Sequence, residues 1–362
     1  MKYRKLGHTG MYVSAISFGT MFYGGAQYQA TDNPVSKEDA VLCLKKAIES
    51  DINYLDCADI YGAYGNAENI IGEVIKDYER TDLVISSKVW FPMSSKVNNR
   101  GLSKKHIQES IHKTLERLNT DYLDLYYCHR YDYSTPLEET IVAMNDLIDQ
   151  GKILYWGTSN WPAAQLERAY GITSKLGLRP PACDQVRYNL FLRYGLEIEL
   201  PYTIEYYGLG TVVYKVLADG LLAGKYDVEK IEDLDEKAIQ NLSHRIGGEF
   251  NASTLEKMHQ LLEIAKDLDL TISQLAYAWV LKNPFVSTAL MSTRKPERIE
   301  ENLKIIDAPL DDESYNKINS ILDNEPRPPV FYLYDSHAYY KKYQSQFQAG
   351  ERGIFPPNFG KF

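Results

Sequence analysis

Four polar side chains along the chain have the types needed to move a proton. Asp56, Tyr61, Lys88 and His129 lie at or just after the ends of three apolar runs, NYLDCA, DLVISSKV and DYLDLYYCHR. A free phenol has a pKa of about 10, too high for ready proton exchange at neutral pH. A nearby ammonium group would lower that pKa, and a carboxylate would keep a buried lysine charged. We predict that Asp56 and Lys88 make Tyr61 an activated general acid, while His129 orients a substrate oxygen.

Each of these residues alone also has an ordinary structural explanation. An aspartate at a strand end is usually a turn or cap residue, and a lysine after a strand is usually solvated. A histidine beside Tyr127 and Cys128 could be a hydrogen-bonded residue of the core. The functional interpretation depends on all four side chains meeting at one place, which the fold must arrange.

Short apolar, β-branched runs alternate with longer amphipathic runs, as expected for strands followed by helices. We predict strands at 13–20, 53–58, 82–89, 121–130, 153–160, 183–190, 210–217 and 287–293. We predict helices at 37–50, 67–78, 103–119, 136–151, 162–177, 195–208, 254–269, 272–283 and 295–306, and a polar loop at about 227–251. Eight strand–helix units predict a closed (β/α)8 TIM barrel of parallel strands. The doubly wound alternative usually carries G-x-G-x-x-G, which the sequence lacks.

Two segments lie outside this alternation. YRKLGHTGMYVS predicts an N-terminal β-hairpin turned at His8–Gly10 that could plug the N-terminal face of the barrel. The segment 325–362 is irregular and rich in proline and aromatic residues, whereas disordered tails are normally poor in aromatics. We therefore predict a barrel domain at 1–324 and a C-terminal aromatic-rich extension at 325–362 that packs on it, over the mouth or at a remote or partner-facing site.

Composition argues against several functions. The net charge of −9 and the pI of about 5.4 give no attraction to nucleic acid or to an anionic membrane. The start of the chain lacks the apolar run of a signal peptide, and no run reaches the ~18 apolar residues of a membrane helix. The four cysteines lack zinc spacing, so we expect no metal. A cytoplasmic location is the expectation.

In a (β/α)8 barrel, the reacting groups lie at the C-terminal ends of the strands. Asp56, Lys88 and His129 end three successive predicted strands. We therefore expect them to converge with Tyr61 within hydrogen-bonding reach.

These segments resemble those of the aldo-keto reductase superfamily. DCADIYGAYGNAE is similar to its aspartate–tyrosine segment, ISSKVW to its lysine segment and LYYCHRYD to its histidine segment. GKILYWGTSNW, DQVRYNLFLR and PERIEENL resemble three further signatures of the superfamily. The resemblance covers roughly residues 2–323, and GLLAGKY is most similar to the bacterial and potassium-channel-β-subunit-like branch.

The resemblance implies NADP(H)-dependent reduction of an aldehyde or ketone to an alcohol. Tyr61 would give the proton, and Asp56, Lys88 and His129 would complete the catalytic tetrad. The implied cofactor-binding residues are Gly19, Thr20, Met21, Asp56, Ser159, Asn160, Gln185, Tyr214, Leu217, Lys225, Thr293, Arg294, Arg298, Glu301 and Asn302.

The choice of NADP(H) over NAD(H) also has support in the residues themselves. Thr293, Arg294, Lys295 and Arg298 gather at the start of the predicted helix in STRKPERIEEN. A helix N-terminus favours anions, and arginine suits a phosphate. The alternative for this segment is a solvated basic turn.

Tyr23, Trp90, Arg130 and Tyr131 are expected to shape the substrate site. Aromatic rings beside polar groups suit sugar-derived or aromatic carbonyl compounds. One alternative is a cofactor-binding regulatory module that senses redox state, as channel β subunits do. Another is a barrel lyase or isomerase that uses Lys88. The partner we expect is a small-molecule carbonyl or alcohol, and the protein could be a homo-oligomer.

Overall fold

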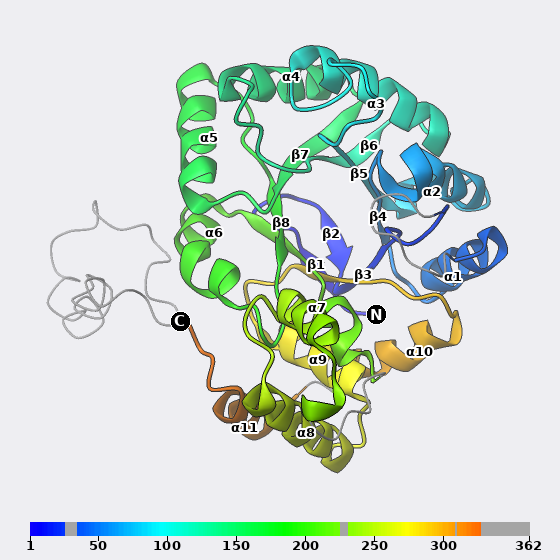
Figure 1. Cartoon of the computed structure of the whole chain (residues 1–362). Coiled ribbons are helices and arrows are strands. Elements are labelled where there is room, and N and C mark those ends of the chain that lie inside the picture. The colour runs from blue at the N-terminus through cyan, green and yellow to red at the C-terminus, as the bar shows by residue number, and fades with distance from the viewer. Residues whose placement is uncertain (26–34, 225–230, 308–309, 327–362) are drawn as a thin grey trace, which may run out of the picture.

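A closed barrel of parallel strands forms the centre of the molecule. The computed structural model describes residues 1–25, 35–224, 231–307 and 310–326 (Figure 1). Eight strands pair side by side in the order β10-β3-β4-β5-β6-β7-β8-β9, all parallel, and a separate pair, β1-β2, is antiparallel. The predicted (β/α)8 barrel with an N-terminal hairpin is therefore confirmed.

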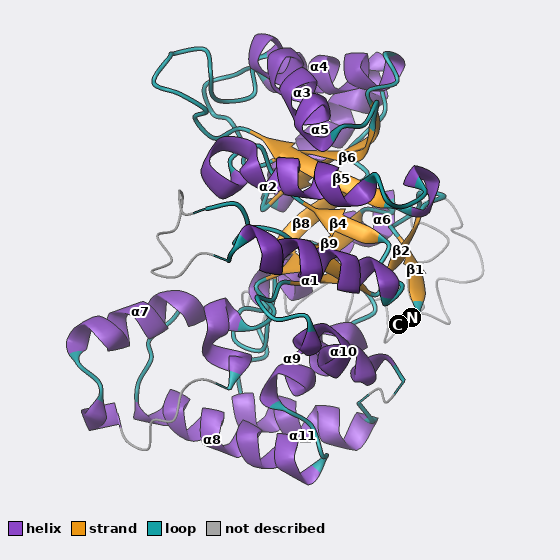
Figure 2. Cartoon of the chain, turned by 90° about the vertical axis from the view of Figure 1, so that its right-hand side faces the viewer, coloured by secondary structure: helices purple, strands orange, loops and turns teal. Residues whose placement is uncertain are grey.

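The strands are short, and the helices surround them (Figure 2). The hairpin strands are β1 Tyr3–Lys5 and β2 Tyr12–Ser14. The barrel strands are β3 Ile16–Gly19, β4 Tyr54–Asp56, β5 Val84–Val89, β6 Leu123–Cys128, β7 Ile153–Ser159, β8 Cys183–Arg187, β9 Gly210–Tyr214 and β10 Thr288–Met291.

The α-helices are α1 Lys37–Glu49, α2 Tyr61–Ile75, α3 Lys104–Leu118, α4 Leu137–Asp149, α5 Ala163–Leu176, α6 Pro201–Tyr207, α7 Glu236–Ile246, α8 Ala252–Asp267, α9 Ile272–Lys282, α10 Glu297–Leu303 and α11 Asp312–Leu322. Single turns of 3₁₀-helix lie at η1 Arg80–Asp82, η3 Ala218–Ala223, η4 Ile231–Asp233 and η5 Lys304–Ile306, and η2 Gly195–Glu199 is a π-helix.

Local sequence explains where several helices begin. The hydroxyl of Ser103 accepts a hydrogen bond from the backbone N–H of His106, which caps α3 as predicted. Pro136 directly precedes α4, where its missing N–H costs no helical hydrogen bond. Thr271 and Gln274 form a reciprocal capping box at the start of α9.

Three predicted elements differ from the structure. The single strand predicted at 13–20 is two strands, because Tyr12–Ser14 pairs in the hairpin and Ile16–Gly19 enters the barrel. The polar loop predicted at 227–251 contains α7, which is capped by Asp235 and buries only Leu242 and Ile246. Two buried apolar residues are too sparse a signal for the sequence pattern. The helix predicted at 195–208 is divided into the π-helix Gly195–Glu199 and α6. By contrast, the regular part of α2 begins after the left-handed residues 62–65, close to the predicted start at 67.

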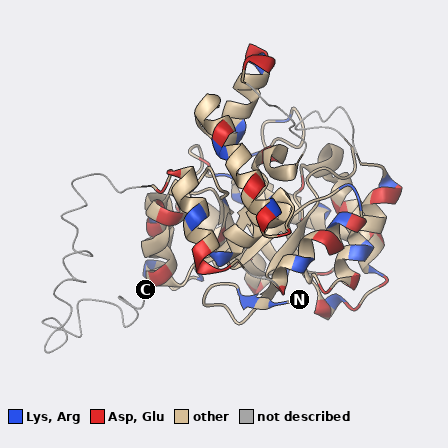
Figure 3. Cartoon of the chain, turned by 90° about the horizontal axis from the view of Figure 1, so that it is seen from below, with Lys and Arg blue, Asp and Glu red and all other residues tan. Residues whose placement is uncertain are grey.

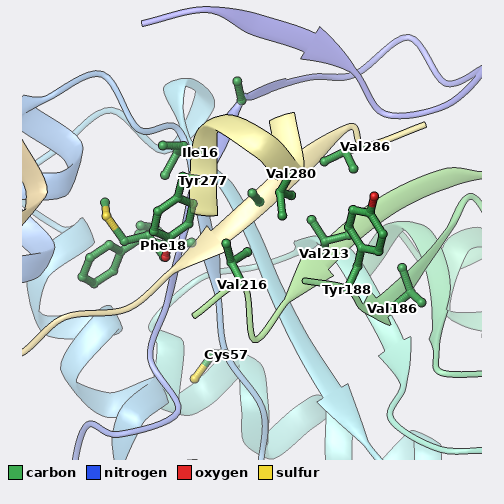
Figure 4. Close-up of a cluster of buried hydrophobic side chains, with 14 of the residues drawn as sticks. Ile16, Phe18, Cys57, Val186, Tyr188, Val213, Val216, Tyr277, Val280 and Val286 are labelled. Carbon is green, nitrogen blue, oxygen red and sulfur yellow. The ribbon is translucent and has the colours of Figure 1, made fainter. Parts of the chain in front are cut away.

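The core has an inner and an outer layer. Leu6 and Val13 of the hairpin segment are fully buried with Tyr54, Leu125 and Val212 in one cluster. The hairpin thus closes the N-terminal end of the barrel, as predicted. A larger cluster packs between strands and helices, and Figure 4 shows side chains of this layer, among them Ile16, Phe18, Tyr277 and Val280.

Acidic and basic residues are interspersed over the outer helices (Figure 3). Within the described ranges, no helix is both long and apolar enough to cross a membrane. The same ranges contain no cluster of three or more histidine, cysteine, aspartate or glutamate side chains that could hold a metal ion. The predicted extension at 325–362 lies outside the described residues, apart from Glu325 and Pro326.

Candidate active site

Strand register brings three of the predicted catalytic residues to one end of the barrel. Asp56 pairs with Ser86 between β4 and β5, and Lys88 pairs with Tyr127 between β5 and β6. His129 follows β6, where its backbone N–H donates to the carbonyl of Val89 at 3.0 Å. Because side chains alternate along a strand, Ser86 and Lys88 share one face. The three strand ends therefore point their polar groups at one place.

Asp56 and Lys88 form a buried ion pair. The Lys88 ammonium lies 2.5 Å from Asp56 Oδ2 and also donates to the Cys57 carbonyl at 2.6 Å. The Lys88 side chain is 0% exposed and that of Asp56 is 3% exposed. The hydroxyl of Ser86 and the amide of Gln185 donate to Asp56 Oδ1, at 2.8 and 2.9 Å. Such full pairing is what a buried charge requires.

Tyr61 lies against this pair through its ring. The Lys88 ammonium is 4.9 Å from the centroid of the Tyr61 ring, and the His129 ring meets it edge-on at 5.8 Å. Burial, with a further contribution from Asp56, raises the pKa of Tyr61 well above its usual 10. The predicted lowering of this pKa is therefore wrong. The pKa is not lowered because burial dominates: the Lys88 ammonium faces the Tyr61 ring, and Asp56 already balances the Lys88 charge.

His129 is held as a neutral imidazole. Burial lowers its pKa well below the usual 6.5, and the charges of Lys88 and Arg130 act in the same direction. The Phe91 ring packs edge-on against it at 4.8 Å. Its Nδ1 is buried and lacks a hydrogen-bond partner within the described residues. A neutral imidazole carries one N–H, so His129 can donate a single hydrogen bond without adding charge.

Four of the predicted cofactor-binding residues, Ser159, Asn160, Gln185 and Tyr214, also come together. Asn160 donates to the Ser159 hydroxyl at 3.1 Å and to the Tyr214 hydroxyl at 3.0 Å. The Ser159 hydroxyl donates to the backbone carbonyl of Gln185 at 3.1 Å. Gln185 contacts Asp56, so this cluster joins the ion pair directly. The hydrogen bond from Asn160 to the Tyr214 hydroxyl fixes the position of the half-buried Tyr214 ring.

Two further predicted cofactor-binding residues, Gly19 and Thr20, lie beside β4. Gly19 pairs with Asp56 at the end of β3. The backbone N–H and the hydroxyl of Thr20 both donate to the Asp56 carbonyl, at 3.1 and 3.0 Å. Met21 and Leu217 are half-buried. Lys225 lies outside the described residues.

The predicted phosphate segment lies between β10 and α10. Arg294 and Arg298 are exposed, and Arg298 pairs with Glu301 at 2.7 Å. The Ser292 hydroxyl is buried without a partner among the described residues. Two other predicted residues of this segment, Thr293 and Asn302, contact neighbouring side chains of the protein. The Thr293 carbonyl accepts a hydrogen bond from Tyr23 at 2.7 Å, and Asn302 Nδ2 lies 3.7 Å from the sulfur of Met291.

The four predicted substrate residues are not equivalent. Tyr23 is 0% exposed and its hydroxyl is engaged by Thr293, so the structure places it in the core and not on a substrate surface. Trp90 meets the ring of Phe91 edge-on at 4.9 Å. Arg130 donates to the Ser159 hydroxyl at 3.3 Å, and the Tyr131 ring packs against Trp161 at 4.8 Å. Of these three, Arg130 contacts His129 and Ser159 directly, whereas Trp90 reaches His129 only through Phe91.

Sequence reasoning missed two residues of this site. Ser86 stands two positions before Lys88, and period-two alternation along the strand was the signal that could have found it. Phe91 contacts His129 from the segment after β5, and nothing local in the sequence indicates that contact.

The segment after Tyr61 has an unusual backbone. Gly62, Ala63, Tyr64 and Gly65 all have positive φ, at 64°, 61°, 67° and 99°. The left-handed conformation costs a residue with a Cβ about 1–2 kcal/mol. We call residues 62–65 the left-handed turn. Behind it, buried Glu68 accepts from Arg117 at 2.6 Å and from Ser87 at 2.5 Å, which fixes the start of α2 against α3 and β5.

Comparison with known proteins agrees with this geometry. A model of the aldo/keto reductase family matches residues 15–323. Two similar proteins are named as probable voltage-gated potassium channel subunit beta, from Oryza sativa subsp. japonica and Arabidopsis thaliana. Each is 36% identical, over 331 and 336 residues, which is 90% and 92% of this chain and 98% and 100% of theirs.

A third relative, a putative voltage-gated potassium channel subunit beta of Schizosaccharomyces pombe, is 38% identical over 331 residues, 90% of this chain and 94% of its own. The family model spans every barrel strand and the four residues Asp56, Tyr61, Lys88 and His129. From the barrel, the site and these matches, the chain belongs to the aldo/keto reductase family.

Proposed function

We propose that this protein is an NADP(H)-dependent oxidoreductase that reduces an aldehyde or ketone to an alcohol. The observation that carries the proposal is the buried Asp56–Lys88 pair beside protonated Tyr61 and neutral His129. A buried ion pair of this kind costs free energy to desolvate, so its place at the strand ends suits a chemical role better than a stabilising one.

The residues present fit a nicotinamide cofactor. Asn160, Ser159 and Gln185 offer amide and hydroxyl groups suited to a carboxamide, and Gln185 links them to Asp56. The unpartnered Ser292 hydroxyl, in one segment with Arg294 and Arg298, suits a phosphate oxygen. When bound, a reduced nicotinamide supplies the hydride.

The chain's own residues would handle the proton. Tyr61 donates its hydroxyl proton to the carbonyl oxygen, and its raised pKa keeps that proton in place at neutral pH. The Lys88 ammonium lies 4.9 Å from the centroid of the Tyr61 ring with its charge matched by Asp56, so burial and not Lys88 sets the protonation of Tyr61. The neutral imidazole of His129 donates a hydrogen bond that orients the carbonyl group. Asp56 keeps Lys88 charged.

The test is substitution of the proposed proton donor. Tyr61→Phe removes the donated proton and keeps the ring, so turnover of NADPH with a panel of aldehydes should fall by about 10²-fold or more. NADPH affinity, measured by fluorescence titration, should be unchanged. Tyr64→Phe, three residues away and exposed, is the matched control and should keep full turnover. Near-normal turnover in Tyr61→Phe would refute the mechanism.

The preference for NADP(H) is a separate proposal. Arg298 is exposed, and its present partner Glu301 can be exchanged for a phosphate at low cost. Arg298→Ala should weaken NADPH binding by about tenfold and leave NADH binding nearly unchanged, because only NADPH carries the 2′-phosphate. Lys304→Ala, also exposed, controls for loss of one positive charge. Equal weakening of both cofactors would overturn the assignment.

A second candidate function rests on the names of the relatives. Three of them are named as potassium channel β subunits, so a cofactor-binding regulatory module is the alternative. Wild-type protein that binds NADPH tightly but oxidises it with no carbonyl in the panel would favour this alternative. The four residues of the tetrad, all present and brought together, favour the enzyme.

The substrate class follows from the surroundings of the tetrad. Arg130 contacts Ser159, Trp90 packs on Phe91, which in turn contacts His129, and Tyr131 packs on Trp161. We propose a sugar-derived or aromatic carbonyl compound, because such rings pack well on aromatic side chains. A cytoplasmic location and a homo-oligomeric state remain predictions from the sequence and the resemblance.

A further inference from the structure

A row of stacked tyrosines lies on the outside of the barrel, away from the strand ends. The Tyr202 and Tyr206 rings stack at 5.4 Å, Tyr206 meets Tyr207 edge-on at 4.7 Å, and Tyr207 stacks on Tyr170 at 3.9 Å. We call these four residues the tyrosine row. Tyr202 and Tyr206 are 52% and 48% exposed, and Tyr194, which precedes α6 in the sequence, is 55% exposed. Clustered tyrosines with half-exposed rings are typical of a surface that binds protein.

A hollow of about 350 Å³ adjoins this row along the same helix. It is lined by residues that include Lys5, His8, Ile204, Glu205 and Phe285. The Oε1 atom of Glu205 is buried and has no hydrogen-bond partner among the described residues, and burial raises the pKa of this carboxyl. Glu205 lines the hollow and is three residues after Tyr202 on α6, so the two side chains are neighbours on the helix. The tyrosine row and the hollow therefore form one face. An occupant that brings a cation to Glu205 would satisfy it.

The described chain ends beside this face. Asn324 donates to the Leu190 carbonyl at 2.7 Å and accepts from Arg193 at 3.2 Å, directly before Tyr194. The last described residues run from α11 to the side of the barrel where α6 lies (Figure 1). The 36 residues from 327 to 362 follow. At about 3.3 Å per extended residue they can reach every part of the face.

The composition of 327–362 is complementary to the face. Ten of its 36 residues are aromatic, and it has five lysine or arginine residues against two acidic ones. The segment 194–207 has three glutamates and no lysine or arginine, and of these Glu197 is paired with Arg193, which leaves Glu199 and Glu205. A tethered segment also has an effective concentration of about a millimolar, well above that of a second copy at ordinary protein concentrations. We propose that residues 327–362 of the same chain dock on the tyrosine row and place a lysine or arginine against Glu205.

This proposal is independent of the proposed enzymatic function. It also favours the remote position for the extension over the position at the barrel mouth. The hollow includes His8 at the tip of the hairpin, which closes the opposite end of the barrel from the tetrad.

The test measures how accessible the segment is in the intact protein. Trypsin can cut after Lys342 and Arg352, and the rate reports the undocked population. Tyr202→Ser/Tyr206→Ser should raise the cleavage rate about tenfold, which corresponds to about 1.4 kcal/mol of lost docking. Tyr64→Ser, at a tyrosine of α2 that is 47% exposed and does not line the hollow, is the matched control and should not change it. An unchanged rate in the double variant would overturn the proposal.

A second variant leaves the tyrosine row intact, so it tests the proposal even if the first variant misfolds. Lys341→Glu/Lys342→Glu alters no described residue, and it should increase amide hydrogen exchange in 194–207. Unchanged exchange there would also overturn the proposal. If the occupant is instead a second copy, protection will fall as the protein is diluted from about 50 to about 1 µM, and light scattering will show a dimer. Concentration-independent protection in a monomer is the result that supports docking within one chain.

Discussion

At the scale of single residues, the site works by setting charge states. Asp56 and Lys88 form a buried ion pair, and Ser86 and Gln185 complete the hydrogen bonds of the carboxylate. Tyr61 and His129 stay neutral because burial disfavours their charged forms. One ion pair and two neutral groups thus lie in a single cluster, which supports the proton transfer proposed above.

These charge states predict a flat pH profile. Tyr61 must be protonated to donate, and its raised pKa keeps it so at all pH values up to about 9. His129 must be neutral, and its lowered pKa keeps it so down to about pH 6. The kcat/KM for carbonyl reduction at saturating NADPH should therefore be constant between about pH 6 and 9. A limb centred near pH 8 that persists in the Tyr64→Phe variant would contradict the raised pKa of Tyr61.

At the scale of elements, the left-handed turn is the least regular part of the site. It follows Tyr61 directly, and its glycines are needed where they are. A Cβ on Gly62 would lie 2.3 Å from the Tyr23 carbonyl oxygen, and one on Gly65 would lie 2.3 Å from the Arg117 guanidinium. Ala63 and Tyr64 occupy the same conformation with a Cβ present, and the Glu68–Arg117 pair holds α2 in place behind them. Strain of this kind is found beside functional groups.

The turn predicts opposite effects for one substitution at two sites. Ala63→Gly removes a Cβ from a left-handed position, so it should raise the free energy of unfolding by up to about 1 kcal/mol. Ala164→Gly, at an exposed position of α5, should lower it by about 1 kcal/mol, as usual within a helix. Urea denaturation measures both. Destabilisation of similar size at both positions would show that the turn is not strained.

At the scale of the whole molecule, one buried arginine joins α11, the last helix of the described residues, to the barrel. Arg193 is 5% exposed and its Nε lies 2.9 and 3.0 Å from the two carboxylate oxygens of Glu197. Its guanidinium also donates to Asn319 of α11 and to Asn324, at 3.2 Å each, and lies 5.1 Å from the centroid of the Trp279 ring. Residues far apart in the chain thus share one cation.

This arrangement predicts a large effect from removing the cation alone. Arg193→Met would leave the Glu197 carboxylate without its ion partner and should lower the free energy of unfolding by about 3 kcal/mol or more. Arg193→Met/Glu197→Leu should recover part of that loss, because the double change leaves no unpaired charge. Urea denaturation of both variants measures the difference. A single variant within about 0.5 kcal/mol of wild type would contradict the role of Arg193.

The sequence by itself determined the barrel and the location of its reacting groups. Alternation of short apolar and longer amphipathic runs is a local pattern, and polar residues at strand ends follow from the parallel barrel it implies. The order of residues along the chain was therefore enough to place Asp56, Lys88 and His129 at one end of the barrel. The hairpin at Tyr3–Ser14 was predictable for the same reason.

Only the tertiary structure decided the properties that depend on burial and on contacts between distant segments. These are the raised pKa of Tyr61, the burial of Tyr23, the contact of Phe91 with His129 and the left-handed turn. Desolvation is a property of everything packed around a group, and a turn wedged between Tyr23 and Arg117 takes its backbone from those neighbours. No local pattern carries that information, because the groups concerned lie tens of residues apart in the chain.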